Sequence, residues 1–315
     1  MSRSLRLALP VALLSALAWL VLVTIPRQAM SVERLALTTS PADIGLAYEN
    51  FSLRPADADL HLAGWWMPAA QARGTLVFIH GGGSHRHSEF FRALRFYRAM
   101  VDAGLNVAAI DLRNHGESDA HPPGLQFGRS ESFDVRAALD WARARAPDLP
   151  LFAMGISMGG ASVIHAAGDG ARVQGLILLD PLLDTADVFA RGAWIQTGLP
   201  PALFLPSGWA VSALHGFPGG ADGALARAAK LDLPILLIQD PQDPVTRLPF
   251  ARELARRNPR VRLWLAPRID ADDPRLAWKE RWGSHVAAFE FFPQQTVAQI
   301  TGFIAAASRA PHPAN

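Results

Sequence analysis

The stretch that decides the fold is LFAMGISMGGASVIHAAG, residues 151–168. Its first part is a short apolar run typical of a buried strand, and its second part has the composition of a helix. The junction is GISMG at residues 155–159, a G-x-S-x-G pattern. A sharp strand-to-helix turn needs small flanking residues, because the backbones pack closely there, and it exposes the serine hydroxyl at the helix start. The segment therefore predicts a nucleophile elbow at Ser157.

Apolar strands and helical patterns alternate on both sides of this junction. Continuous apolar strands separated by helices indicate a mostly parallel sheet that helices cover on both faces. Residues 182–230 break the alternation; they are rich in proline, glycine and aromatics and too long for an ordinary loop, so we expect a small helical cap there. Strands are expected within 46–68 (two), and at 75–80, 106–113, 151–157, 173–180, 234–240 and 261–267, with helices at 90–104, 130–147, 158–168, 248–258 and about 287–307.

The amino-acid composition limits the classes of protein to which this chain can belong. The chain has 315 residues, half of them hydrophobic, which is enough for one substantial core. The formal net charge is only +2 and no dense basic run occurs outside the termini, so nothing indicates nucleic-acid binding. The absence of cysteine excludes disulfides, thiolate metal sites, a cysteine nucleophile and an acylated-cysteine anchor.

The N-terminus carries an apolar run without a charge at residues 7–25. As a helix it would be about 28 Å long, enough to cross the hydrocarbon core of a bilayer. No small-residue cleavage pattern follows it, which favours an uncleaved signal anchor. The alternatives are a cleaved signal peptide, which would release a secreted protein, and a buried core helix. We expect an anchor over residues 1–30 and a catalytic domain over 31–315. Arg3 and Arg6 before the run, against Arg27 after it, weakly favour a single-pass protein whose catalytic domain lies outside the inner membrane.

A serine nucleophile needs a base, and the base needs an acid that orients it. Two acids are candidates: Asp240, which ends the strand expected at 234–240, and Asp243, which follows it. We favour Asp243, which lies three residues beyond the strand end, and expect Asp240 to cap the strand or turn. His285 precedes the last expected helix and is the natural base.

The developing oxyanion needs two backbone N–H donors. Met158, directly after the nucleophile, would supply one. The second is expected from the glycine cluster after the strand at 75–80, with Gly82 as the first choice and Gly83 as the second.

Other segments carry a resemblance to a known family. Residues 111–118, DLRNHGES, look like a D-x-R-x-H-G-x-S segment, and Gly128, Glu131 and Asp134 look like the G-x-x-E-x-x-D pattern that opens a helix in many α/β-hydrolases. With GWWMP at residues 64–68, the chain resembles the Bem46-type, ABHD-like serine hydrolases from about residue 48 to residue 307.

The resemblance implies an α/β-hydrolase fold and a Ser157, Asp243 and His285 triad, with no cofactor and no metal. Two features depart from the family pattern. Asp240 stands where many relatives have glycine, and an acidic stretch at 270–273 precedes His285 and would reshape the pocket rim.

The function expected from these residues is cleavage of a carboxylic ester or thioester through an acyl-enzyme. An apolar cap and a membrane tether favour a small-molecule or lipid-like acyl substrate. A peptidase or amidase, a non-catalytic tethered binding protein, and a lyase or perhydrolase on the same residues remain alternatives. The His85-Arg86-His87 triplet is a weak metal signal, and we expect structural roles for His115, Glu117, Glu131 and Asp134.

Overall fold

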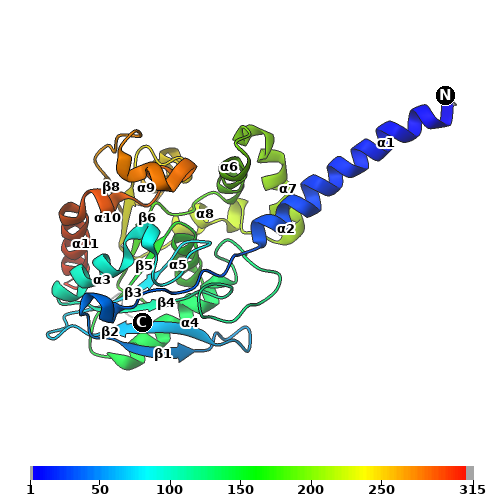
Figure 1. Ribbon diagram of the computed structural model, residues 1–315. Coiled ribbons are helices and arrows are strands. Elements are labelled where there is room, and N and C mark those ends of the chain that lie inside the picture. Colours follow the sequence, from blue (N-terminus) through cyan, green and yellow to red (C-terminus); the bar gives the residue numbers. More distant parts are fainter. Residues whose placement is uncertain (1–2, 310–315) are drawn as a thin grey trace.

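The computed structural model describes residues 3–309 and contains one eight-stranded sheet in the order β1-β2-β4-β3-β5-β6-β7-β8. The strands β3 to β8 run parallel, while β1 and β2 join the edge by antiparallel pairing (Figure 1). The mostly parallel sheet confirms the predicted α/β-hydrolase architecture. The strands are β1 (Glu49–Leu53), β2 (Leu62–Met67), β3 (Thr75–Ile79), β4 (Asn106–Ile110), β5 (Leu151–Ile156), β6 (Gly175–Leu179), β7 (Ile235–Gln239) and β8 (Val261–Leu265).

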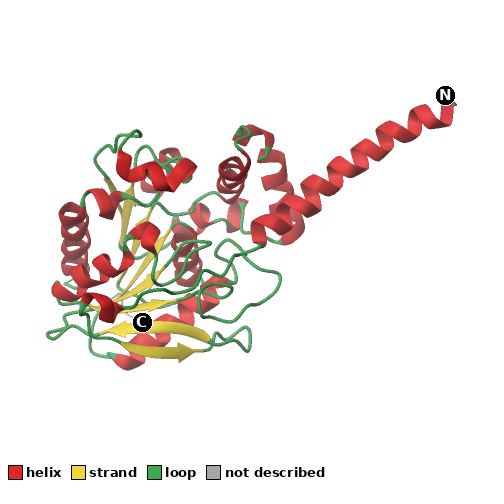
Figure 2. Ribbon diagram, viewed as in Figure 1, coloured by secondary structure: helices red, strands yellow, loops and turns green. Residues whose placement is uncertain are grey.

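Helices cover both faces of this sheet (Figure 2). Successive strand residues point to opposite faces; in β3, Val77 packs into the apolar cluster on one face and Phe78 into the cluster on the other. The central strands are apolar throughout because both faces are buried. The first face is covered by α4 (Glu131–Arg145), α5 (Met158–Gly168) and α9 (Leu248–Arg257), and the second by α3 (Ala93–Asp102) and α11 (Pro293–Ala307).

The C-terminal helix is not the single helix expected over about 287–307. It is divided into α10 (Ala288–Phe291) and α11, and Phe292 between them has non-helical dihedral angles. Pro293 explains the break, because proline has no N–H to donate and disfavours helical geometry in the residue before it.

Between β6 and β7 the chain forms the helices α6 (Thr185–Thr197), α7 (Leu205–His215) and α8 (Ala224–Ala228), with short 3-10 turns at Pro201–Leu203 and Gly220–Asp222. We call residues 182–230 the cap segment. Helices α6 and α7 pack against each other and stand beside the base of the N-terminal helix (Figure 1).

The N-terminal helix projects away from the body of the protein (Figure 1). It comprises α1 (Arg3–Trp19), a π-helical turn (Leu20–Thr24) and α2 (Ile25–Met30). Its stretch Pro10–Met30 is long and apolar enough to cross a membrane. The boundaries of an anchor at 1–30 and a catalytic domain at 31–315 stay predictions.

Candidate active site

The turn between β5 and α5 places Ser157 at the carboxyl edge of the sheet. Ser157 has φ +51° and ψ −119°, an unfavourable conformation for a residue with a side chain, and it is partly exposed between buried neighbours. Gly155 and Gly159 are required in the turn because no side chain fits at either position. A Cβ on Gly155 would lie 2.2 Å from the carbonyl oxygen of Gly159, and one on Gly159 would lie 2.4 Å from the carbonyl oxygens of Ile79 and His80.

Ser157, His285 and Asp243 come together from three separate loops. The hydroxyl Oγ of Ser157 lies 3.0 Å from Nε2 of His285, and Nδ1 of the same ring lies 2.6 Å from Oδ2 of Asp243. Because a carboxylate only accepts, Nδ1 carries the proton and Nε2 is free to accept from the serine hydroxyl. His285 and Asp243 are buried, and the Trp282 ring stacks on His285 with centroids 5.7 Å apart. This arrangement can remove a proton from Ser157.

The Asp243 carboxylate is held by its own loop. Its Oδ1 accepts from the amides of Val245 and Thr246 at 2.6 and 2.9 Å, and its Oδ2 accepts from the Thr246 hydroxyl at 2.7 Å. Asp240 instead accepts from the amide of Gln242 at 2.9 Å, as a turn-capping residue does. Of these two acids, it is Asp243 that hydrogen-bonds to His285.

Asp180 is a buried acid that was not among the site residues predicted from the sequence. It follows β6, and its carboxylate accepts from the amides of Asp240 and Val286 at 2.7 and 3.0 Å. It therefore joins the loop of Asp243 to the loop of His285. Burial, and then the neighbouring carboxylates of Asp243 and Asp240, raise the pKa of Asp180 well above its ordinary value. The available signal was its place at the carboxyl end of an apolar strand, the edge at which Ser157 also lies.

The glycine loop after β3 lies against the elbow. The amide of Gly83 donates to Nε2 of His115 at 3.1 Å, so it is already engaged. Within the described part of the chain, the amides of Gly82 and Met158 have no recorded acceptor, and a Cβ on Gly82 would lie 3.4 Å from Sδ of Met158. That these two amides bind a developing oxyanion stays a prediction.

Two buried histidines fix this glycine loop. His115 donates from Nδ1 to the carbonyl of Arg113 at 2.7 Å, and His80 donates from Nδ1 to the carbonyl of Gly81 at 2.7 Å while accepting the amide of Leu112 at 3.0 Å. Each Nε2 must stay unprotonated to accept its backbone N–H. Burial lowers the pKa of both rings to about 3, so both are neutral near pH 7.

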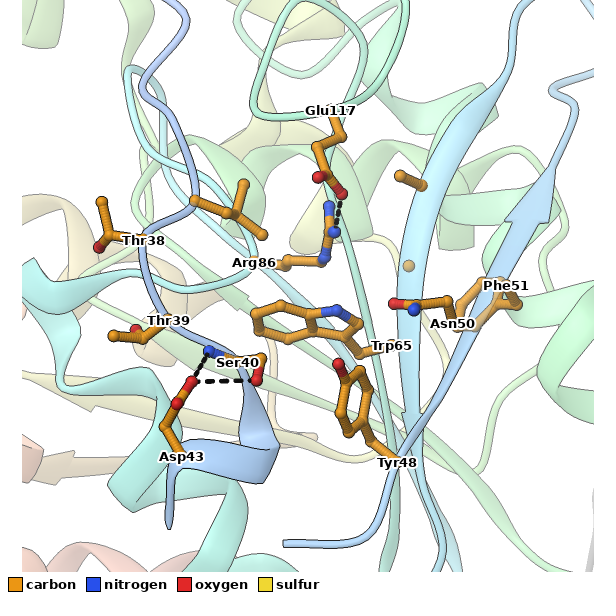
Figure 3. Close-up of a pocket in the computed structure, with 13 residues that line it drawn as sticks. Thr38, Thr39, Ser40, Asp43, Tyr48, Asn50, Phe51, Trp65, Arg86 and Glu117 are labelled. Atoms are coloured by element: carbon orange, nitrogen blue, oxygen red, sulfur yellow. Dashed lines mark hydrogen bonds and ion pairs between the residues drawn. The ribbon is translucent and has the colours of Figure 1, made fainter. Parts of the chain in front are cut away.

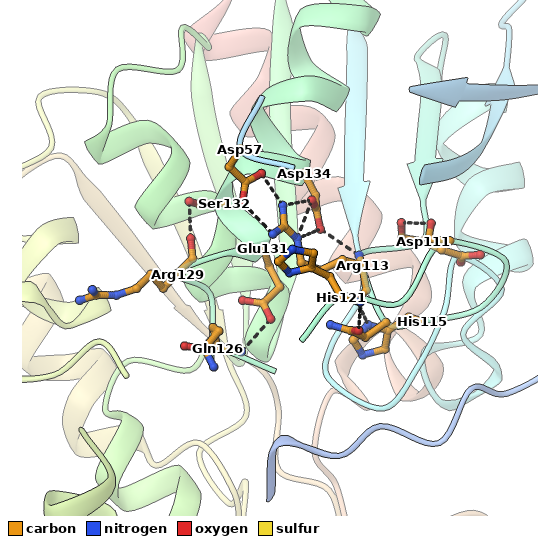
Figure 4. Close-up of polar contacts among 12 residues, drawn as sticks. Asp57, Asp111, Arg113, His115, His121, Gln126, Arg129, Glu131, Ser132 and Asp134 are labelled. Carbon is orange, nitrogen blue, oxygen red and sulfur yellow. Dashed lines mark hydrogen bonds and ion pairs between the residues drawn. The ribbon is translucent and has the colours of Figure 1, made fainter. Parts of the chain in front are cut away.

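Arg113 is the centre of a second buried network, which Figure 4 shows. Its guanidinium pairs with Asp134 at 2.7 Å and with Asp57 at 2.7 Å. Nearby, the carboxylate of Glu131 accepts from the amides of Gln126 and Gly128 at 2.9 and 3.0 Å. These contacts tie loops beside the sheet to α4, in keeping with the structural roles expected for Glu131 and Asp134.

The possible metal ligands are engaged in hydrogen bonds. Ligand atoms of Asp180, Asp243 and His285 lie within 4.8 Å of one another, but these groups already bond to one another, to backbone amides or to Ser157. In the His85-Arg86-His87 triplet, the His87 ring bonds to Thr39 at 2.8 Å. Arg86 pairs with Asp111 and Glu117.

A surface groove of about 390 Å³ lies beside the strands β1 and β2, and Figure 3 shows its lining. Tyr48, Trp65, Arg86 and Glu117 contribute to its lining, and the Arg86 guanidinium lies 4.6 Å from the centre of the Trp65 ring. None of its lining residues belongs to the Ser157 cluster. The groove is therefore a separate feature of the surface.

Comparison with known proteins finds relatives and structural neighbours of this chain. Residues 70–207 match the family described as serine aminopeptidase, S33. The chain is 28% identical to monoglyceride lipase of Mus musculus over 131 residues (41% of each chain), and 26% identical to lysophosphatidylserine lipase ABHD12 of Mus musculus over 144 residues (38% of this chain, 33% of the relative). The chain thus spans less than half of the length of these relatives. Among solved structures, the esterase Pf2001 of Pyrococcus furiosus superposes with a TM-score of 0.69 at 22% identity, covering 88% of this chain and 98% of the esterase.

The fold is that of the α/β-hydrolases. Within that class, the chain resembles the ABHD-like serine hydrolases.

Proposed function

We propose that the protein is a serine hydrolase that cleaves a carboxylic ester or thioester, with Ser157 as nucleophile, His285 as base and Asp243 as the orienting acid. The observation that carries the proposal is the continuous hydrogen-bonded chain from Ser157 Oγ through His285 to Asp243. Relatives named as lipases and a structural neighbour named as an esterase support the same reaction class.

In the proposed reaction, Oγ of Ser157 attacks the substrate carbonyl carbon while Nε2 of His285 takes the hydroxyl proton. The carbonyl oxygen becomes an oxyanion that the amides of Gly82 and Met158 stabilise. Collapse of this intermediate returns the proton from Nε2 to the leaving alcohol or thiol and leaves an acyl-Ser157 ester. Water then repeats the two steps, which release the carboxylic acid and regenerate the serine.

The proposed substrate is a lipid-like acyl compound. The cap segment offers apolar and aromatic side chains near the site, and the N-terminal helix can tether the protein at a membrane. We propose that this helix is a single-pass signal anchor that leaves the catalytic domain on the outer side. A periplasm-active reporter fused to the C-terminus tests the orientation; an inactive fusion would contradict it.

A second candidate is an amidase or peptidase on the same residues, which the matching family description favours. The two reactions share the nucleophile and differ in the leaving group. A panel of acyl esters set beside aminoacyl amides separates them, and turnover of amides without turnover of esters would replace our main proposal.

Labelling with a fluorophosphonate probe tests the nucleophile directly. We expect the intact protein to be labelled and Ser157→Ala to be unlabelled. Ser162→Ala is a matched control, because Ser162 is a buried serine of the same helix α5. Failure of the folded wild-type protein to label would contradict the proposal and favour a non-catalytic binding role.

A further inference from the structure

The cap segment carries several large apolar side chains that are exposed on the outside of the protein. No Asp, Glu, Lys or Arg occurs from residue 192 to residue 221. We call cap face the four large apolar side chains of this stretch that are more than half exposed: Leu199 (51%), Leu203 (63%), Trp209 (65%) and Leu214 (63%). Exposed apolar side chains that gather in one segment of a protein surface are a feature of sites that contact a membrane or another protein.

Helix α7 of the cap segment is joined to the N-terminal helix by a hydrogen bond. Nε2 of His215, at the end of α7, lies 3.1 Å from the carbonyl oxygen of Leu22. Leu22 lies in the π-helical turn Leu20–Thr24, and the partner that its carbonyl would have in an α-helix is Pro26, which has no N–H. The imidazole therefore donates to this carbonyl at the point where an α-helix would have lost its own donor. A carbonyl without a donor is costly in a lipid environment, so this bond suits a helix that enters a bilayer.

The position of this bond along the N-terminal helix places the cap at the membrane boundary. Leu22 stands three residues before Ile25, the last residue of the uncharged run, so it lies about 4.5 Å inside the end of that run along the helix axis. The first charge beyond the run is Arg27. Helices that lie in the membrane interface are buried by about 5–10 Å. The end of α7 and the uncharged surface next to it therefore lie at the depth of an interfacial element.

We propose that the cap face inserts into the leaflet from which the N-terminal helix emerges, so that the cap is a second membrane contact beside the anchor. The absence of charge across residues 192–221 means that this contact depends on apolar burial and not on attraction to anionic lipids. Trp209 has the amphipathic side chain that is enriched at membrane interfaces.

This contact specifies the substrate class, a statement that rests on the proposed function. Helix α6 bonds directly to both site loops: Arg191 donates to the carbonyl of Pro244, next to Asp243, at 2.7 Å, and Arg281 of the His285 loop donates to the carbonyl of Ile195 at 2.8 Å. The membrane contact is thus adjacent to the site. The substrate is an acyl ester that resides in the bilayer, and not one that arrives from water.

The experiment uses the absence of native cysteine. Single-cysteine variants of the full chain, W209C and L214C, are spin-labelled and reconstituted into vesicles of zwitterionic lipid, and into a second set with anionic lipid. The controls are W278C and L265C, which replace exposed residues of the same types outside the cap segment. We expect the labels at 209 and 214 to collide with oxygen at least tenfold more, relative to a water-soluble nickel complex, than the control labels do, in both lipids.

Three results would overturn the inference. The first is equal access of the nickel complex to the labels at 209 and 278. The second is protection of the label at 209 with spin–spin broadening, which would show that a second copy of the chain covers the cap face. The third is a depth for the label at 265 equal to that at 214, because embedding would then not be specific to the cap.

Activity supplies a separate readout. The double variant W209S/L214S is expected to lose at least tenfold in turnover of a long-chain ester embedded in vesicles and to stay within twofold of wild type on a water-soluble short-chain ester, with W278S as control. Equal losses on both esters would contradict the substrate class. If the wild type cleaved no ester while the labels still reported insertion, the proposed function would fail and the membrane contact would stand.

Discussion

Replacing Asp243 with Asn exchanges one carboxylate oxygen for an NH₂ group, and we expect this to move the proton of the His285 ring from Nδ1 to Nε2. Oδ1 of Asp243 accepts two backbone N–H groups, from Val245 and Thr246. An Asn at this position must keep its carbonyl oxygen there, because an NH₂ group would face two donors. Its NH₂ then takes the place of Oδ2 and points at Nδ1 of His285, 2.6 Å away in the native arrangement.

Two N–H groups cannot hydrogen-bond to each other, so Nδ1 must become the acceptor and the proton moves to Nε2. An imidazole with its proton on Nε2 cannot accept the proton of Ser157. Loss of the correct tautomer lowers kcat on the order of 10⁴-fold in a serine–histidine–aspartate arrangement, or about 5 kcal/mol of activation free energy. The fold keeps both backbone bonds, so we expect the free energy of unfolding to fall by no more than about 2 kcal/mol.

The assay compares kcat on a water-soluble ester and the rate of fluorophosphonate labelling for wild type, Asp243→Asn and Asp240→Asn. Asp240 is the matched control because it is a neighbouring buried acid that accepts from the Gln242 amide and does not hydrogen-bond to His285. We expect Asp240→Asn to stay within about tenfold of wild type. The reasoning is refuted if Asp243→Asn keeps activity within tenfold of wild type, or if the two variants lose activity equally.

Three further predictions concern the groups around the site. Gly81→Ala places a Cβ 3.2 Å from Cβ of Ser157 and should lower kcat on the order of 10²-fold by displacing the nucleophile. Gly82→Ala, whose Cβ meets only ordinary van der Waals contacts, should lower kcat less. Equal losses of kcat in the two variants would contradict this. The pKa of His115 is about 3 in the folded protein and about 6.5 in the unfolded chain, so the unfolded chain binds the extra proton first as the pH falls below 6.5. The free energy of unfolding of the wild type, measured by urea titration, should therefore fall by about 2 kcal/mol relative to that of His115→Gln at pH 5. Parallel curves of unfolding free energy against pH for the two proteins would refute this. Arg113→Met leaves Asp57 and Asp134 without their partner and should lower the free energy of unfolding by about 3–5 kcal/mol. Arg145→Met, which removes an exposed ion pair, should lower it by about 1 kcal/mol or less. Similar losses of unfolding free energy in the two variants would contradict a stabilising role for the buried network.

Much of the fold could be predicted from the sequence because its signals are local. The central strands are buried on both faces, so each is an apolar run whose ends are visible in the sequence. The elbow is equally local, since the glycines around Ser157 are required by contacts within the turn and with β3. Pro293 indicates a break in the C-terminal helix, but the apolar pattern continues across it and predicts a single helix.

Contacts between distant segments could not be predicted in the same way. Spacing and chain order pointed to Asp243 and His285, but they gave no distance between the two side chains. They also could not show that the Gly83 amide is engaged by His115, thirty-two positions away, or that His215 bonds to the carbonyl of Leu22. Asp180 was overlooked because an acid at a strand end is common, and its importance depends on which backbone amides face it.

The loop of His285 is held from several directions, and this links the site to the cap. Val286 donates to Asp180 beneath the site, Trp282 stacks on the imidazole, and Arg281 bonds to the carbonyl of Ile195 in α6. Helix α6 packs on α7, which contacts the N-terminal helix. A displacement of the cap must therefore break the bond between Arg281 and α6 or move the His285 loop with it. Since the proposed proton transfer depends on a 3.0 Å contact between His285 and Ser157, the position of the cap and the proposed reactivity of the serine are mechanically connected.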